Sequence, residues 1–199
     1  MSSGRAASTV MKRDAAQAML VTKRLFMRMP VGEDIPALSR LVSDPLIARY
    51  TSQIRYPYVP IDARRFVESC TQDPTPNVAA HFLLAPRANP RLIAGGAGFG
   101  WEIGGVPEIG YWVAAAYRGR GFAGEAVEAL LYRIFTGSAA ETVRAACYPD
   151  NAASRRVLER AGFHRSGRGM RDSQMYKRYM PVIEFTLERP QWAKRQAPF

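Results

Sequence analysis

A short glycine-rich segment between two apolar stretches constrains this chain more than any other feature. The segment Arg118-Gly-Arg-Gly-Phe-Ala123 follows strand-like residues that end at Val113 and precedes a helix-like apolar pattern that ends at Gly137. Glycine lets the backbone approach a ligand closely, and the first turn of a helix leaves its N–H groups without partners inside the helix. Several N–H groups and the positive end of the helix dipole then face one point. The segment therefore predicts a site for a pyrophosphate.

Length and composition limit the kind of protein that can carry such a site. The 199 residues, 47% of them hydrophobic, suffice for one domain with a sizeable core. No apolar run approaches the roughly 20 residues that cross a bilayer, which argues against a membrane protein. Cys70 and Cys147 cannot form a disulfide framework, and neither they nor His81 and His164 show metal-ligand spacing. We expect a cytoplasmic protein without a metal site.

The net charge of +11 is unevenly distributed along the chain. Residues 1–24 contain five Lys or Arg and one acid, and residues 189–199 contain three Lys or Arg and no acid. Residues 144–171 carry seven Arg against two acids, a local +5 close to the glycine-rich segment. Such a patch would attract a ligand with several phosphates, although a solvated basic face has the same composition. A nucleic-acid-binding domain would need a recognition helix or an aromatic platform motif, and the sequence shows neither.

The predicted elements describe one domain over 21–192. An N-terminal extension over 1–20, flexible or partly helical, precedes it, and a basic tail over 193–199 follows it. The glycines at 95, 96, 98 and 100 indicate a bulge or close packing in a middle strand. In chain order we predict a strand over 21–29, a helix over 35–42, a loop over 56–60, a helix over 62–70, a meander of strands over 78–84, 92–94 and 106–113 with a turn at 103–105, a helix over 123–137, a strand over 142–148, a helix over 151–162 and a strand over 183–187.

The glycine-rich segment also matches the G-x-G-x-x-G fingerprint of dinucleotide-binding folds, with Gly119, Gly121 and Gly124. In those folds the first glycine follows a strand of a parallel βαβ unit almost directly. Here five residues, 114–118, separate Val113 from Gly119, and the preceding strands are predicted to be antiparallel. A dinucleotide site and a glycine turn that binds nothing stay as alternatives.

A series of further motifs keeps a fixed order along the domain. They are Thr22-Lys-Arg-Leu25 with Arg28, Ser43-Asp44-Pro45, Glu108-Ile-Gly-Tyr-Trp-Val113, the glycine-rich segment, Asn151-Ala-Ala-Ser154, Val157-Leu158-Glu159, Gly162-Phe163 and Phe185-Thr-Leu-Glu-Arg189. Each is weak alone, but their joint order and spacing resemble the GNAT superfamily of N-acetyltransferases, and more narrowly its RimJ/RimL-type branch. The resemblance implies a single α/β (α+β) domain with a mixed, mostly antiparallel sheet of about six or seven strands, about four helices, and splayed fourth and fifth strands.

The same resemblance implies acetyl-CoA as the acyl donor, lying in the gap between the splayed strands. Edge groups of the fourth strand would hold the pantetheine arm as they would hold an added strand, and the glycine-rich segment would hold the pyrophosphate. Asn151 would contact the arm from the other side, would cap its own helix, or would do both. The predicted cofactor-binding residues are Trp112, Val113, Arg118, Gly119, Arg120, Gly121, Phe122, Ala123, Asn151 and Ser154.

The implied reaction is direct transfer of the acetyl group to a primary amine in a ternary complex. It needs an unprotonated amine, a donor to the developing oxyanion and a proton for the thiolate. Glu108 is the candidate base, acting through a water, with an exposed hairpin carboxylate as the alternative; the N–H near Val113 is the candidate oxyanion donor. Many superfamily members carry a tyrosine where this chain has Leu158. Ser154, if it is more than a first-turn serine, is the candidate donor to the sulfur, and Tyr148 is a weaker one.

The acceptor is the least specified part of the reaction. The branch implies a protein N-terminal α-amine, such as that of a ribosomal protein, whereas many relatives acetylate small amines such as polyamines, amino acids or antibiotics. A non-catalytic acyl-CoA-binding module is a further alternative, which the missing tyrosine favours and Glu108 opposes. We expect a peptide or small-molecule partner rather than a specific nucleic acid or a membrane, and either a monomer or a homodimer.

Overall fold

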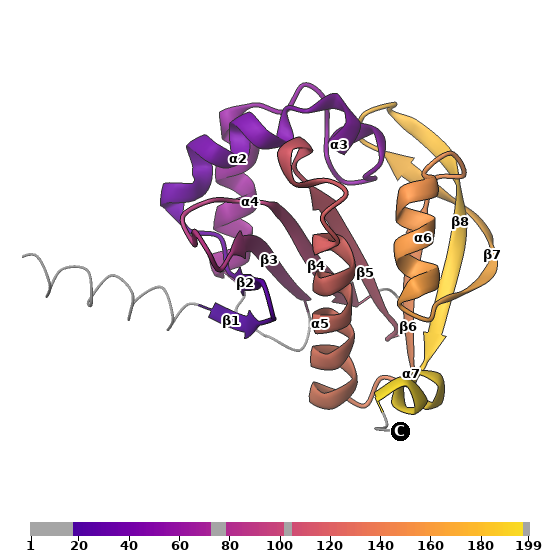
Figure 1. Cartoon of the computed structure of the whole chain (residues 1–199). Helices are drawn as coiled ribbons and strands as arrows, with labels where there is room; N and C mark the ends of the chain where they lie inside the picture. The colour runs from indigo at the N-terminus through magenta and orange to yellow at the C-terminus, as the bar shows by residue number, and fades with distance from the viewer. Residues whose placement is uncertain (1–17, 73–78, 102–104, 197–199) are drawn as a thin grey trace, which may run out of the picture.

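The computed structural model describes residues 18–72, 79–101 and 105–196 of the chain, and these residues form one sheet flanked by helices (Figure 1). The strand order is β1-β2-β3-β4-β5-β6-β8-β7, and neighbouring strands are antiparallel except β5 and β6, which are parallel. The predicted mixed, mostly antiparallel sheet is confirmed. It has eight described strands where about six or seven were predicted, and the described residues form six α-helices where about four were predicted. The strands are β1 (Ala18–Val21), β2 (Leu25–Arg28), β3 (Ala79–Pro86), β4 (Gly95–Trp101), β5 (Pro107–Val113), β6 (Thr142–Cys147), β7 (His164–Ser173) and β8 (Arg178–Glu188); the helices are α2 (Ile35–Val42), α3 (Pro45–Arg49), α4 (Pro60–Gln72), α5 (Phe122–Gly137), α6 (Ala152–Arg160) and α7 (Arg189–Gln196), with 3-10 turns η1 (Gly32–Asp34) and η2 (Ala115–Tyr117).

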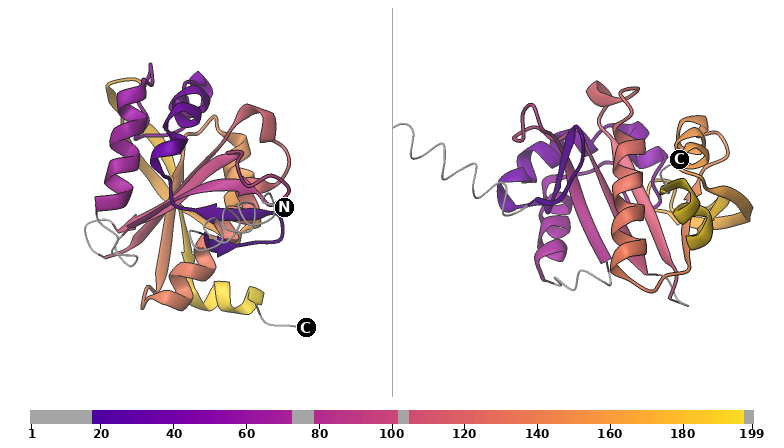
Figure 2. Two further views of the ribbon diagram at one scale, coloured as in Figure 1. Left: turned by 90° about the vertical axis from the view of Figure 1, so that its left-hand side faces the viewer. Right: turned by 60° about the horizontal axis from the view of Figure 1, so that its bottom comes forward.

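Helices cover both faces of the sheet, as the two views of Figure 2 show. On one face, the apolar side of α5 packs on the strands, and Trp192 of α7 stacks on Phe135 with ring centroids 5.0 Å apart. On the other face, α2, α3 and α4 form a smaller cluster over β3 that includes Leu38, Ile47 and Leu83. The sheet is therefore buried on both sides near its middle, where the gap described below opens. None of the described helices is long and apolar enough to cross a membrane.

The first strands form a hairpin, so the predicted single strand over 21–29 is wrong. β1 and β2 pair antiparallel, and Thr22 N donates to Leu25 O at 2.9 Å across the turn. This turn brings Lys23 and Arg24 to the N-terminal end of α5. Residues 18–20 of the predicted extension belong to β1, and residues 1–17 lie outside the described part of the chain.

The predicted middle strand is present as β4, which consists mostly of the glycines themselves, but it begins at Gly95 and does not include residues 92–94. A Cβ on Gly96 would lie 2.5 Å from Trp112 Nε1, and a Cβ on Gly98 would lie 2.4 Å from Ala80 O. The predicted close packing is confirmed: the Trp112 indole lies against Gly96, and the backbone of β3 lies against Gly98. Val78, the predicted start of the preceding strand, and residues 103 and 104 of the predicted turn lie outside the described residues.

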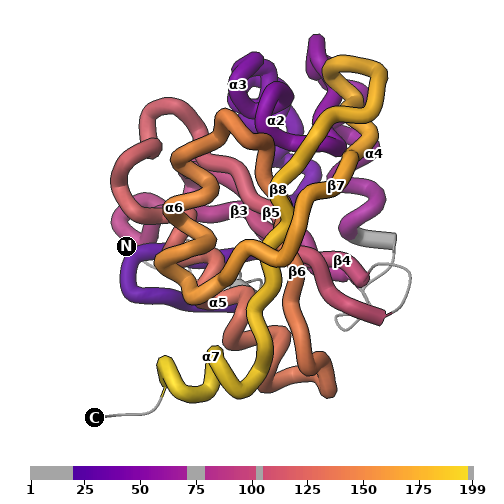
Figure 3. Tube along the Cα trace, turned by 90° about the vertical axis from the view of Figure 1, so that its right-hand side faces the viewer, coloured from indigo at the N-terminus to yellow at the C-terminus, as the bar shows by residue number. Residues whose placement is uncertain are grey.

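Among the described α-helices and strands, α3, β7 and α7 have no counterpart in the prediction. Asp44 caps α3 by accepting from Leu46 N at 2.9 Å, and Pro45 occupies the first turn, so this dipeptide begins a helix. β7 pairs with β8 along its whole length and forms the sheet edge, on the near side in Figure 3. α7 follows β8 directly.

The central feature for function is the gap between β5 and β6. These strands pair at only two positions, Glu108 with Arg144 and Ile109 with Ala145, and separate beyond them. They are the fourth and fifth strands of the predicted domain, so the predicted splay is confirmed. Because the two strands are parallel, the glycine-rich loop after β5 and the start of α6 after β6 lie at the same end of the sheet, at the top of Figure 1.

Candidate active site

A cavity of about 1180 Å³ lies along the gap between β5 and β6. Both strands line it, together with the glycine-rich loop, the first residues of α6, and parts of α2, α3 and α4. Its polar side chains differ between regions: Arg118 and Arg156 belong to the loop and α6, whereas His81, Glu108 and Arg171 belong to the strands. One continuous cavity thus joins a basic region to a region that contains a carboxylate.

The glycine-rich loop has the backbone shape that an anion site needs. Gly119 and Gly121 have φ angles of 74° and 80°, in the left-handed region that side chains disfavour. Helix α5 begins at Phe122 with Gly121 as its N-cap, and no side chain caps it. Its first N–H groups have no partner within the helix, so they and the helix dipole are oriented toward an anion at this end.

Both arginine side chains of the loop contact the protein itself. Arg118 Nη2 lies 2.6 Å from Asp44 Oδ2, and its Nε donates to Val113 O at 3.2 Å. The Arg120 guanidinium lies over the Tyr117 ring, 5.4 Å from its centroid. The predicted contribution of this loop to phosphate binding therefore falls mainly on its backbone N–H groups, with the arginines adding positive charge nearby.

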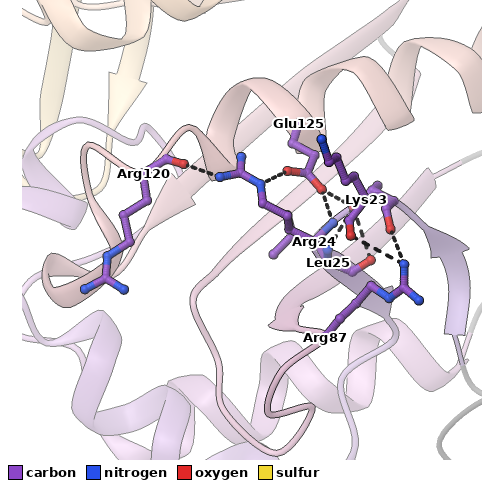
Figure 4. Close-up of polar contacts among 7 residues, drawn as sticks. Lys23, Arg24, Leu25, Arg87, Arg120 and Glu125 are labelled. Atoms are coloured by element: carbon purple, nitrogen blue, oxygen red, sulfur yellow. Dashed lines mark hydrogen bonds and ion pairs between the residues drawn. The ribbon is translucent and has the colours of Figure 1, made fainter.

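The turn of the N-terminal hairpin makes hydrogen bonds with the loop and with the start of α5, as Figure 4 shows. Arg24 donates through Nη1 to Arg120 O at 2.8 Å and through Nε to Glu125 Oε2 at 2.7 Å. The other oxygen of Glu125 accepts from Arg24 N at 2.6 Å and from the Thr22 hydroxyl. Thr22 and Arg24 belong to a motif that carried the family resemblance, and the structure gives that motif a physical role.

Pairing with β4 decides which backbone groups of β5 face the gap. Ala114 N donates to Ala94 O at 2.9 Å, and Trp112 stands opposite Gly96 in the same ladder. Since alternate residues of a strand point their N–H and C=O to opposite sides, those of Trp112 face β4 and those of Val113 face the gap. The expectation that Trp112 offers backbone groups to the arm is therefore corrected; Val113 keeps that predicted role.

On the opposite side of the gap, Asn151 and Ser154 begin α6. Asn151 Oδ1 accepts from Ser154 N at 3.0 Å, so Asn151 is a helix cap, and its contact with a cofactor stays a prediction. The Ser154 hydroxyl lies 2.9 Å from the hydroxyl of Tyr111 on β5. The sequence did not single out Tyr111 as a site residue. Burial raises the pKa of Tyr111 well above its usual value, so its phenol stays protonated and bridges the two sides of the gap.

Glu108 lies where the gap closes and is paired instead of free in solvent. Its Oε2 lies 2.9 Å from Arg171 Nη2, and Arg171 Nη1 lies 3.4 Å from Glu184 Oε1. The side chain of Glu108 is 23% exposed and lines the cavity, which argues against an exposed hairpin carboxylate. Arg171 belongs to β7, a strand absent from the prediction, so no sequence signal pointed to this partner.

The comparison with known families agrees with this geometry. The model of the acetyltransferase (GNAT) domain matches residues 24–164. The chain belongs to the GNAT acetyltransferase family. A curated relative, the uncharacterized N-acetyltransferase p20 of Bacillus licheniformis, is 29% identical over 177 residues, which are 87% of this chain and 98% of the relative.

Solved structures share the fold of this GNAT enzyme at low sequence identity. RimL, the ribosomal L7/L12 alpha-N-protein acetyltransferase, in complex with coenzyme A, matches with a TM-score of 0.71 and 20% identity over 85% of this chain and 97% of that chain. The microcin C7 self immunity acetyltransferase MccE, in complex with acetyl-CoA and AMP, matches with a TM-score of 0.70 and 17% identity over 83% of this chain and 93% of that chain. These likenesses establish the fold alone.

Leu158 stands where the family resemblance led us to expect a tyrosine as the thiolate acid. Leu158 is 1% exposed within the main core and does not line the cavity. Tyr148 does line it, and its buried hydroxyl has no hydrogen-bond partner among the described residues. A buried hydroxyl without a partner is costly, and a ligand in the gap would supply one. Ser154, Tyr111 and Tyr148 all line the cavity, so each brings a hydroxyl group to the gap.

Proposed function

We propose that this enzyme moves the acetyl group of acetyl-CoA directly to a primary amine in a ternary complex, and that the amine is the N-terminal α-amine of a protein or peptide. The observation that carries the proposal is the gap between the parallel strands β5 and β6. It connects an uncapped helix N-terminus at its open end with the Glu108 carboxylate where it closes. Donor and acceptor can therefore meet within one cavity.

The residues around the gap fit acetyl-CoA, which supplies an activated acetyl thioester when bound. The N–H groups of the loop and of the first turn of α5 would hold the diphosphate, because Gly119 and Gly121 leave the backbone uncovered there. Val113 would hold the pantetheine arm through its backbone, and the amide of Asn151 would contact the arm from α6. The coenzyme A and acetyl-CoA in the RimL and MccE structures support this choice of donor.

The proposed chemistry assigns one task to each polar group. Glu108 removes the proton of the amine through a water, and Arg171 fixes the orientation of its carboxylate. The N–H of Val113 donates to the carbonyl oxygen as negative charge develops on it. Ser154, held by Tyr111, donates to the departing sulfur, with Tyr148 as the second candidate.

The size of the cavity and the family branch support a peptide acceptor. At about 1180 Å³ it exceeds the roughly 300–1,000 Å³ of a typical small-ligand pocket, which leaves room for a second substrate beside the donor. The region away from the loop includes residues of α3, α4 and the segment between them, such as Tyr50, Tyr58 and Phe66. The likeness to RimL adds support at the level of the fold.

A thiol-release assay tests the acceptor. We expect release of coenzyme A with peptides that carry a free α-amine, and none with the same peptides acetylated at the N-terminus and containing a lysine. Turnover of polyamines, amino acids or aminoglycosides without turnover of any peptide would contradict the α-amine proposal in favour of a small-molecule enzyme. Binding of coenzyme A without turnover of any amine would favour a binding module.

Replacement of Glu108 by Gln tests the base. Glu108→Gln should lower kcat by roughly 10²- to 10⁴-fold, the usual contribution of a general base, while the Kd for coenzyme A stays near that of the wild type. Glu188→Gln, a neutralisation at an exposed position of β8, is the matched control and should change neither quantity. An unchanged pH–rate profile in Glu108→Gln would remove Glu108 from the mechanism.

A further inference from the structure

Arg24, on the turn between β1 and β2, contacts the glycine-rich loop from outside the gap. Its guanidinium donates to the carbonyl of Arg120, pairs with Glu125 in the first turn of α5, and stacks on Phe122 at 5.0 Å from the ring centroid. A Cβ at Gly121 would lie 3.2 Å from Arg24 Nη2. One side chain thus contacts the residues on either side of Gly121, namely Arg120 and Phe122, and also Glu125 in the helix that follows.

The contact with the Arg120 carbonyl determines the direction of an N–H group. In a planar trans peptide, the C=O of one residue and the N–H of the next point in opposite directions. Arg24 draws the Arg120 oxygen toward the N-terminal hairpin, which lies on one side of α5, while α6 and the gap lie on the other (Figures 1 and 4). The N–H of Gly121 therefore points away from the hairpin, and Gly121 itself lines the cavity.

From this geometry we propose that Arg24 is a positioning residue for the diphosphate of coenzyme A: it holds the Arg120–Gly121 peptide so that the Gly121 N–H donates to a phosphate oxygen. The inference rests on the proposed function, because it presumes that the loop binds the diphosphate. It adds a residue that lies 96 positions before Arg120 in the sequence and acts through the backbone without touching the ligand.

Charge balance indicates that Arg24 acts by orientation more than by attraction. Glu125 faces Arg24 at 2.7 Å, so the pair brings little net charge to the loop. Burial alone would raise the pKa of Glu125, but hydrogen bonds from Thr22 and from the backbone and side chain of Arg24 bring that pKa below its usual value. Glu125 therefore stays ionised at neutral pH and anchors the guanidinium in the position that reaches Arg120 O.

Calorimetric titration with coenzyme A and with 3′-dephospho-coenzyme A tests the proposal on the full-length protein. Arg24→Ala should raise the Kd for both ligands by the same factor, roughly tenfold, because it loosens one charge-assisted contact that orients the diphosphate site. Arg24→Lys should raise the Kd nearly as much, since one ammonium cannot reproduce the planar fork that reaches Glu125 and Arg120 together. The KM for acetyl-CoA should rise while kcat at saturation stays near that of the wild type.

Arg87→Ala is the matched control. Arg87 donates to the carbonyls of Thr22 and Lys23 at 3.3 and 3.4 Å and stacks on Phe26, but these contacts do not include the glycine-rich loop. The Kd of Arg87→Ala for both ligands should stay within about twofold of the wild-type value. A twofold change is smaller than the effect of losing one hydrogen bond. If Arg24→Ala melts too early to titrate, Glu125→Gln removes the anchoring charge and should weaken both ligands by a smaller, equal factor.

Three results would overturn the inference. One is an Arg24→Ala protein that binds coenzyme A as the wild type does. Another is full affinity in Arg24→Lys, which would assign the effect to charge alone. The third is a loss for coenzyme A but none for the dephospho form, which would place Arg24 at the 3′-phosphate. A wild-type protein that binds neither ligand would instead refute the proposed function, and the inference with it.

Discussion

Gly121→Ala probes the glycine-rich loop most sharply, because the backbone angle at this position sets the size of the effect. At a φ of 80°, an alanine costs roughly 1–2 kcal/mol relative to glycine, part of which is offset by the lower entropy of the unfolded chain. The new Cβ would lie 3.2 Å from the end of the flexible Arg24 side chain, a contact that can relax with a small movement. We therefore expect a loss of about 1 kcal/mol in the free energy of unfolding, which lowers the melting temperature by about 2–4 °C.

Gly105→Ala is the control that separates backbone strain from function. Gly105 has a φ of 73°, and a Cβ there meets nothing within 4 Å, so the expected loss of stability is the same. It precedes β5, at the end of the strand away from the loop. Thermal unfolding followed by calorimetric titration should show two similar melting temperatures, but a roughly tenfold rise in the Kd for coenzyme A in Gly121→Ala alone. Equal affinities in the two variants, with both destabilised, would refute the assignment of the loop to the diphosphate.

Other predictions concern the hydroxyl pair, a buried histidine and a buried ion pair. Tyr111→Phe removes one hydrogen bond to Ser154, so it should lower kcat about 5- to 10-fold while the Kd for coenzyme A in titrations stays unchanged. A kcat equal to that of the wild type would exclude a role for this hydroxyl pair in catalysis. Burial lowers the pKa of His81 in the folded protein, so the unfolded chain binds a proton on this imidazole at a higher pH than the folded protein does. The free energy of unfolding should therefore fall as the pH drops from about 6.5 toward the folded-state pKa. Unfolding measured as a function of pH should show that His81→Gln lacks this part of the pH dependence. Asp34→Asn breaks two contacts of 2.7 Å with Arg28, between side chains only 12% and 9% exposed, and should cost about 3 kcal/mol in denaturant unfolding; a loss below about 1 kcal/mol would mean that the pair behaves like a surface ion pair.

Local chemistry explains which elements the sequence predicts. Helix α5 combines apolar residues at helical spacing with a glycine-rich start, and the structure buries those residues against the sheet. Strand β7 has no such signal, because it is an edge strand that alternates Gly167 and Gly169 with arginines and exposes much of both faces. Helix α3 is missed for another reason: Asp44-Pro45 is a signal for a turn and also for a helix start, and only the tertiary packing of Ile47 distinguishes them.

The site residues likewise differ in how far the sequence predicts them. The loop and the start of α6 are contiguous motifs, so their residues can be chosen from the sequence. The contacts that hold those motifs are long-range: Tyr111 and Ser154 are 43 residues apart, and the side chains of Arg24 and Glu125 meet across 101 residues. The register in which β5 pairs with β4 also decides whether Trp112 or Val113 faces the gap. Such facts follow from how the elements pack against one another.

Thermal unfolding of the purified protein with acetyl-CoA, coenzyme A or NADH tests the central claim most directly, because a ligand that binds only the native state raises the melting temperature. At 100 times its Kd, a ligand adds about 2.7 kcal/mol, which corresponds to a rise of about 5–10 °C for a domain of this size. The account predicts such a rise with acetyl-CoA and coenzyme A and none with NADH. No rise with either coenzyme A species, or an equal rise with NADH, would contradict it.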